Sequence, residues 1–177
     1  MLINLGLACI GLIALFLIFV ATRPSDFAIT RTAVLPATPD QVFALVNDFH
    51  AWENWSPWAK LDPKCKNSFE GATSGVGAKF AWDGNNEVGS GYMEIRESRP
   101  HELIKLDLVF SRPMQATNVT VFTFQPNGSG TRMTWTMSGK NGFVGKLFSV
   151  IMNCDKMVGG QFEKGFDNMR NVLASVK

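Results

Sequence analysis

The sequence predicts an α+β domain of two layers, preceded by a transmembrane helix, and three observations lead to this fold class. Residues 2–21 form an apolar run that contains no charged residue. Residues 65–140 alternate apolar and polar side chains between short turn signals, a pattern typical of antiparallel strands. From Phe143 onward, apolar residues recur every three or four positions, which predicts one long amphipathic helix. Such a helix is needed to cover the apolar face of the sheet.

The run from Leu2 to Ala21 has the length of a membrane span. At a rise of ~1.5 Å per residue, a helix of this length covers ~30 Å, the thickness of the hydrocarbon core of a bilayer. A cleaved signal peptide is the alternative, but no Lys or Arg precedes the run, and residues 20–22 are a poor cleavage site. We therefore expect residues 1–23 to anchor a domain formed by residues 24–177.

Charged groups beside the run indicate on which side of the membrane the domain lies. Arg23 and Arg31 follow the run, whereas only the α-amine precedes it. Because positive residues beside a span stay in the cytoplasm, this distribution favours a single-pass membrane protein with a cytoplasmic domain.

The domain begins with a strand and two short helices. Residues 27–35 alternate apolar and small polar side chains, as a strand does. Thr38 is a candidate N-cap, and Pro39 suits the first position of the helix that follows. A second helical turn is expected to carry Trp52 and Trp55.

About six further strands follow, and a long helix closes the chain. The Asp-Gly pair at 83–84 lies between two alternating runs, which is a strong hairpin signal. The closing helix, over residues 143–176, contains a pair of glycines at 159–160. Glycine in a helix interior is unfavourable, so this pair predicts either a kink or a close approach of the helix to the sheet.

Composition excludes several function classes. The net charge of +2 comes from scattered Lys and Arg without a basic stripe, so nucleic acid is not an expected partner. Cys9, Cys65 and Cys154 form no CxxC pair, and only His50 and His101 offer imidazole ligands, so we expect no metal and no disulfide framework. The stretches "GVGAKF" and "GSG" precede no helix, so we expect no phosphate-bearing cofactor.

Four stretches of the chain form a recognisable set: "LPATPDQVFALVNDFHAWENWSPW", "GVGAKFAWDGNNEVGSGYMEI", "RMTWTMSG" and "KMVGGQFEKGFDNMRNVL". Together they resemble the SRPBCC superfamily, which includes START lipid-transfer domains, the birch-pollen-allergen family and the polyketide cyclase/dehydrase group. The resemblance covers residues 27–177 and is nearest to small bacterial members of the cyclase/dehydrase group. It implies the helix-grip fold, in which a curved antiparallel sheet of about seven strands wraps around a long C-terminal helix. With the anchor, it implies a protein of the bacterial inner membrane.

The sequence predicts a binding function because it has bulky apolar residues but no evident catalytic constellation. The superfamily includes carriers, receptors, cyclases and chaperone activators, so the fold alone does not give the function. No nucleophile and base stand out as a catalytic constellation, whereas bulky apolar residues are placed to face the interior. We expect a cavity between sheet and helix for a small hydrophobic ligand that is lipid-, quinone- or polyketide-like. The candidate ligand-binding residues are Trp55, Trp58, Phe80, Trp82, Tyr92, Leu108, Met133, Trp135, Met137, Val158 and Phe162.

Two other functions stay open on the sequence. An enzyme of the cyclase/dehydrase or hydrolase type needs a polar group deep in the cavity, for which Tyr92, Glu94 or His50 are the candidates. A docking function needs exposed tryptophans in "FHAWENWSPWAKLDP" that contact a membrane or a partner protein. If this stretch instead covers the core at the ligand entrance, Trp55 and Trp58 become candidates for a gate.

Overall fold

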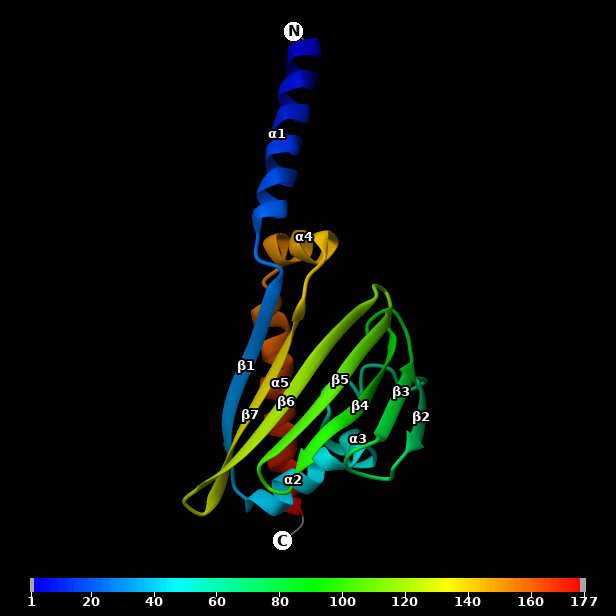
Figure 1. Cartoon of the computed structure of the whole chain (residues 1–177), viewed down its shortest axis with the longest axis vertical. Helices are drawn as coiled ribbons and strands as arrows, with labels where there is room; N and C mark the ends of the chain where they lie inside the picture. The colour runs from blue at the N-terminus through cyan, green and yellow to red at the C-terminus, as the bar shows by residue number, and fades with distance from the viewer. Residues whose placement is uncertain (1, 176–177) are drawn as a thin grey trace.

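The computed structural model describes residues 2–175 and contains a seven-stranded antiparallel sheet that curves around a long C-terminal helix (Figure 1). The predicted α+β helix-grip arrangement and its number of strands are therefore confirmed. In chain order the strands are β1 (Asp26–Leu35), β2 (Lys66–Gly71), β3 (Ala78–Asp83), β4 (Ser90–Arg99), β5 (Leu103–Arg112), β6 (Ala116–Asn127) and β7 (Gly130–Lys140). The helices are α1 (Leu2–Thr22), α2 (Pro39–Asn47), the 3-10 helix η1 (Phe49–Ala51), α3 (Trp52–Trp55), α4 (Phe143–Ile151) and α5 (Cys154–Ser175).

The sheet has two different ends. Its strand order is β1-β7-β6-β5-β4-β3-β2, and every neighbouring pair is antiparallel. The starts of β1, β4 and β6 and the ends of β3, β5 and β7 therefore share one end, which we call the upper end because it lies uppermost in Figure 1. The opposite end, with the end of β1 and the start of β7, is the lower end.

Short helices close the lower end. Thr38 precedes α2 as predicted, and its backbone N–H donates to the side-chain Oε1 of Gln41 at 3.2 Å. This contact and Pro39 at the start of α2 fix where the helix begins. On the inner face of α2, the ring of Phe43 lies 5.5 Å from that of Phe124 on β6. The lower end is therefore filled by apolar side chains.

Helix α1 extends away from the upper end of the sheet (Figure 1). Within the part of the chain that the structure describes, no helix is both long enough and apolar enough to span a membrane. The predicted span includes residues 2, 3, 5 and 8, whose side chains lie outside the described ones.

The prediction of one continuous C-terminal helix is wrong, because the segment is divided into α4 and α5. The break lies at Met152, which has extended backbone angles (φ −117°, ψ 136°). The side-chain Oδ1 of Asn153 then accepts a hydrogen bond from the backbone N–H of Lys156 at 2.9 Å, as an N-cap does. The glycine pair causes no break. Gly159 instead allows the close approach to the sheet that was the alternative, since a Cβ there would lie 2.1 Å from Nη2 of Arg31 on β1.

Candidate functional site

The strand register assigns each side chain to one of the two faces of the sheet. Side chains alternate along a strand, and directly paired residues of neighbouring strands point to the same face. Ile95, Leu106, Phe122 and Trp135 are buried and define the concave face, which α5 covers. Following the register, the concave face carries Phe27, Ile29, Arg31, Gly139, Met137, Met133, Asn118, Thr120, Phe124, Ile104, Leu108, Phe110, Gly91, Met93, Phe80 and Trp82.

The lower half of the concave face is a filled core centred on Trp135. The Trp135 ring stacks on Phe162 of α5 with centroids 4.1 Å apart, and Trp55 and Phe122 pack against it at 5.7 Å and 5.0 Å. All four are almost completely buried, as is Met133. The candidates Trp55, Met133, Trp135 and Phe162 therefore lie in the core rather than at an opening.

The upper half of the concave face is less completely covered. Helix α5 packs on β1, and half-buried apolar side chains remain on several strands and on α5 itself. These side chains are bulky and retain some access to solvent. We call this part of the interior the upper concave region; its members are Phe27, Phe80, Trp82, Leu108, Phe110, Met137 and Val158.

Two buried polar side chains adjoin this region, and the sequence reasoning did not identify them. Asn118 is 7% exposed and lies between Leu108 and Gly139 in the register. Thr120 is 3% exposed and lies opposite Met137. A Cβ at Gly139 would be 2.2 Å from Oδ1 of Asn118, so glycine leaves the room that the amide occupies. In ligand-binding pockets generally, a few polar groups among apolar ones orient the ligand.

Tyr92 does not belong to the site, and this prediction is wrong. It alternates with Met93, which is buried on the concave face, so Tyr92 points to the convex face. There the ammonium of Lys79 lies 4.9 Å from the centre of its ring. The register gives Tyr92 this place because a strand turns successive side chains to opposite faces.

The other residues named for catalysis also lie outside the interior. Glu94 is on the convex face, where Glu94 and its neighbour Asp107 both form ion pairs with Arg96. The pKa of Arg96 is raised, chiefly because its guanidinium donates a hydrogen bond to the carboxylate of Asp107. The side chain of His50 is 51% exposed, with its ring stacked 4.1 Å from that of Phe69. The enzyme alternative therefore lacks the deep polar group that it required from these residues.

The tryptophan stretch is mainly structural. Trp52 and Trp55 are 6% and 0% exposed, and their indole N–H groups donate to the carbonyl oxygens of Val46 and Leu45 at 2.9 Å and 2.8 Å. These two residues are therefore neither an exposed docking patch nor a gate. Trp58 is half-buried, with its ring 6.0 Å from Trp135, and lies at the margin of the filled core.

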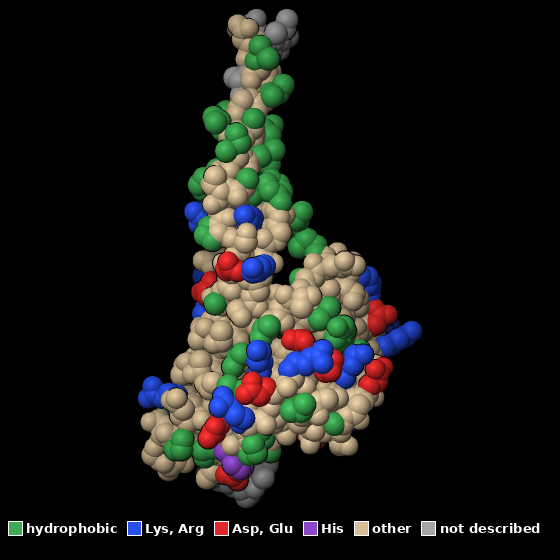
Figure 2. Space-filling view, viewed as in Figure 1, with side chains coloured by type: hydrophobic (Ala, Val, Ile, Leu, Met, Phe, Trp, Pro, Cys, Tyr) green, Lys and Arg blue, Asp and Glu red, His purple; other side chains and the backbone are tan. Residues whose placement is uncertain are grey.

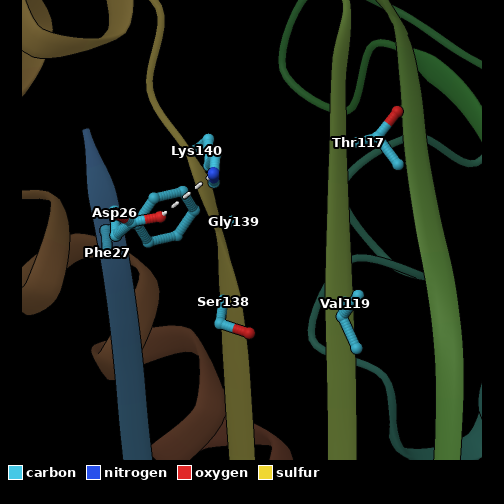
Figure 3. Close-up of a pocket in the computed structure, with 7 residues that line it drawn as sticks. All are labelled: Asp26, Phe27, Thr117, Val119, Ser138, Gly139 and Lys140. Carbon is cyan, nitrogen blue, oxygen red and sulfur yellow. Dashed lines mark ion pairs between the residues drawn. The ribbon is translucent and has the colours of Figure 1, made fainter.

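A surface hollow of about 410 Å³ lies near the upper end of β1, β6 and β7 (Figure 3). Most of its side chains point to the convex face, including Asp26 and Lys140, whose charged groups are 3.9 Å apart. Phe27 and Gly139 belong to the concave face, whereas the other lining residues lie on the opposite face from the upper concave region. The lining residues are Asp26, Phe27, Thr117, Val119, Ser138, Gly139 and Lys140.

The described residues offer little for metal binding or for thiol chemistry. Among the residues that the structure describes, no three His, Cys, Asp or Glu side chains come together as a metal site. Cys65 has a raised pKa, chiefly because it is partly buried and secondarily because Asp62 is near, so its thiol stays protonated at neutral pH.

Comparisons with known proteins agree with the fold. The profile of a family described as Polyketide cyclase / dehydrase and lipid transport matches residues 26–174. No curated protein matches the chain at a significant level.

Several solved structures have the same fold at low sequence identity. The protein CV1439 from Chromobacterium violaceum has a TM-score of 0.60 and 15% identity, over 82% of this chain and 95% of that chain. A Staphylococcus aureus protein of unknown function, SA2116, gives 0.64 and 14%, over 87% and 97%. Ara h 8.0201 gives 0.62 and 10%, over 85% and 99%.

Proposed function

Because the chain belongs to the polyketide cyclase/dehydrase and lipid transport family, we propose that it binds a small hydrophobic ligand between the upper concave region and α5. The observation that carries this proposal is the contrast between the two halves of the concave face. Trp135 and its neighbours fill the lower half, whereas Leu108, Met137 and Trp82 above them are only half-buried. Large apolar side chains left half-covered inside a curved sheet favour an apolar occupant.

The chemistry of the region indicates the class of ligand. Its walls are aromatic, aliphatic and thioether groups, of which Met137 is the most adaptable. Asn118 and Thr120 add one amide and one hydroxyl beside these walls. A mostly apolar molecule with one or two polar atoms, such as a lipid, a quinone or a polyketide, matches this combination.

We further propose that α1 anchors the domain in a membrane. Its apolar side chains are exposed around the helix; Leu7, Ile10, Leu12, Ile13, Leu15 and Ile18 are each about 60% exposed or more. Water is an unfavourable environment for such a surface, whereas lipid tails suit it. Arg23 follows the helix, which favours a cytoplasmic domain.

A pair of substitutions on β5 tests ligand binding. Leu108 and Val109 are adjacent and half-buried, but Leu108 faces the concave side and Val109 the convex side. Leu108→Trp should fill the upper concave region, whereas Val109→Trp adds the same bulk outside it. The full chain, in phosphatidylcholine nanodiscs, is irradiated with a diazirine-bearing palmitate, and labelled peptides are identified by mass spectrometry.

We expect labels on the concave residues of β4 to β7 in the wild-type chain. Leu108→Trp should reduce this labelling several-fold, and Val109→Trp should leave it unchanged. Circular dichroism of both variants checks that the sheet is intact. Labelling confined to α1, or equal labelling of the two variants, would refute a ligand site in the upper concave region.

A further inference from the structure

We propose that α4 is an interfacial helix whose apolar face lies in the headgroup region of a lipid bilayer beside α1. This inference rests on the membrane anchoring proposed above and adds a second contact surface to it. The partner of the exposed face of α4 is the bilayer surface.

The first observation is the apolar face of α4. Val144, Phe148 and Ile151 are spaced as i, i+4 and i+7 and therefore share one side of the helix. They are 50%, 46% and 67% exposed, and none of the residues of α4, all of which the structure describes, is buried. A short helix held against a domain normally buries its apolar stripe, so this stripe lacks its partner within the described chain.

The second observation is the position of α4 at the base of α1. It runs crosswise to α1 where that helix meets the upper end of the sheet (Figure 1). The ammonium of Lys146 donates a hydrogen bond to the carbonyl oxygen of Ala21 at 3.2 Å, which ties the two helices together. Figure 2 shows hydrophobic side chains along the projecting helix down to this base. A helix that lies crosswise at the end of a membrane-spanning helix is at the depth of the lipid headgroups.

The third observation is the distribution of charge. Residues 143–151 contain no acidic side chain, and their one charge is Lys146, on the side of α4 away from Phe148. Arg23 follows α1 directly, with its guanidinium carbon 5.5 Å from the ring centre of Phe19. Cations next to an apolar face match the phosphates and acyl chains of a bilayer surface. The combination of cations with an apolar face favours lipid as the partner. Binding a second copy of the chain would need only the apolar face.

The geometry has a consequence for the site. Because β1 starts and β7 ends at the upper end, α1 and α4 lie at the same end of the sheet as the upper concave region. A bilayer that holds both helices therefore faces the less covered half of the interior. A hydrophobic ligand would then reach the site from the membrane without crossing water.

Depth-dependent quenching tests the inference on the full chain. Single cysteines carrying the environment-sensitive dye NBD are introduced at Ile151→Cys, on the apolar face, and at Ser149→Cys, on the other side of α4. Val76→Cys is the matched control, because Val76 is apolar and 58% exposed but lies in the loop between β2 and β3 at the lower end. Leu12→Cys reports on α1. The background carries Cys9→Ala, Cys65→Ala and Cys154→Ala.

The protein is reconstituted in vesicles of phosphatidylcholine and phosphatidylglycerol with a nitroxide placed near the headgroup or near the middle of the acyl chain. We expect the dye at position 151 to be quenched mainly by the shallow nitroxide and the dye at position 12 by the deep one. The dye at position 149 should be quenched less than that at 151, and the dye at 76 by neither.

Each outcome separates the two proposals. If position 12 is quenched and position 151 is not, α1 is an anchor and the interfacial role of α4 is refuted. If position 151 is quenched and position 12 is not, α4 contacts lipid while the anchoring by α1 fails. If 151 is shielded only when the protein concentration rises, with no quenching by lipid, a second copy covers the face, and the inference is overturned.

Discussion

Replacing Gly159 by alanine should destabilise the domain, although alanine favours helices. A Cβ at Gly159 would lie 2.1 Å from Nη2 and 2.3 Å from Cζ of Arg31. That guanidinium is held in place by hydrogen bonds to Asp155 at 2.9 Å and to Glu163 at 3.0 Å. The side chain of Arg31 can leave room for a methyl group only by giving up part of this arrangement. At the neighbouring Gly160, a Cβ would meet no described atom within 4 Å.

The two glycines give a matched pair with different expected energies. Gly160→Ala should stabilise the helix by up to ~1 kcal/mol, the difference in helix propensity. Gly159→Ala makes the same gain, but crowding in a packed position costs about 1–3 kcal/mol. The variants should therefore differ by about 1–3 kcal/mol in the free energy of unfolding. In a chain of this length, each 1 kcal/mol corresponds to a change in Tm of about 2–4 °C.

Unfolding by urea, followed by tryptophan fluorescence in one detergent, measures this difference on the full chain. The double variant Arg31→Ala/Gly159→Ala supplies the control. In the Arg31→Ala background, the Gly159 substitution should become stabilising, as at Gly160, because the clash is gone. If Gly159→Ala equals Gly160→Ala in the wild-type background, the account of Gly159 as space for Arg31 is refuted.

Two further predictions concern acid and the core. The pKa of Asp155 is lowered, chiefly by its hydrogen bond to Arg31, so its contribution to stability is present at neutral pH and is lost as the pH falls through the folded-state pKa. The difference in Tm between wild type and Asp155→Asn should thus shrink below about pH 4; a constant difference would contradict this. Trp135→Ala should cost about 3–5 kcal/mol in urea unfolding because it removes the ring stacked on Phe162. Tyr92→Phe, on the convex face, is the control, and equal losses would contradict the assignment of the core.

Local signals predicted the elements of the fold well. Thr38 and Pro39 mark the start of α2, and the structure begins the helix at Pro39. The alternation of Met133, Trp135 and Met137 predicted β7, in which the first two are buried on the concave face. These signals work because capping and strand alternation depend on residues a few positions apart.

Features set by distant contacts were harder to predict. Apolar periodicity continues through Ile151 and Cys154, so the sequence gives little sign of the break between α4 and α5. Asn153, whose side chain caps the new helix, was the available signal. The role of Gly159 depends on Arg31, which is more than a hundred residues away in the chain. No local pattern shows such a contact.

The residues of the site also differ in how well the sequence could place them. Tyr92 shares its strand parity with Glu94, and Met93 shares its parity with Ile95, so alternation alone would have placed the tyrosine on the polar face. Asn118 was harder to place, because apolar residues occur on both faces of β6. Only the register, which pairs Asn118 with Gly139, assigns it to the concave side.

The burial of the tryptophans supports the placement of the proposed site at the upper end. Trp52 and Trp55 have satisfied indole N–H groups and lie in the core, so they stabilise the interior and leave no opening around themselves. Trp58, half-buried against Trp135, marks where this filled part ends. Beyond it, helix cover becomes incomplete and apolar side chains keep some exposure. Because the lower half is filled, the proposed ligand would bind in the half that α1 and α4 adjoin, and the proposed binding site and membrane contact would share one end of the molecule.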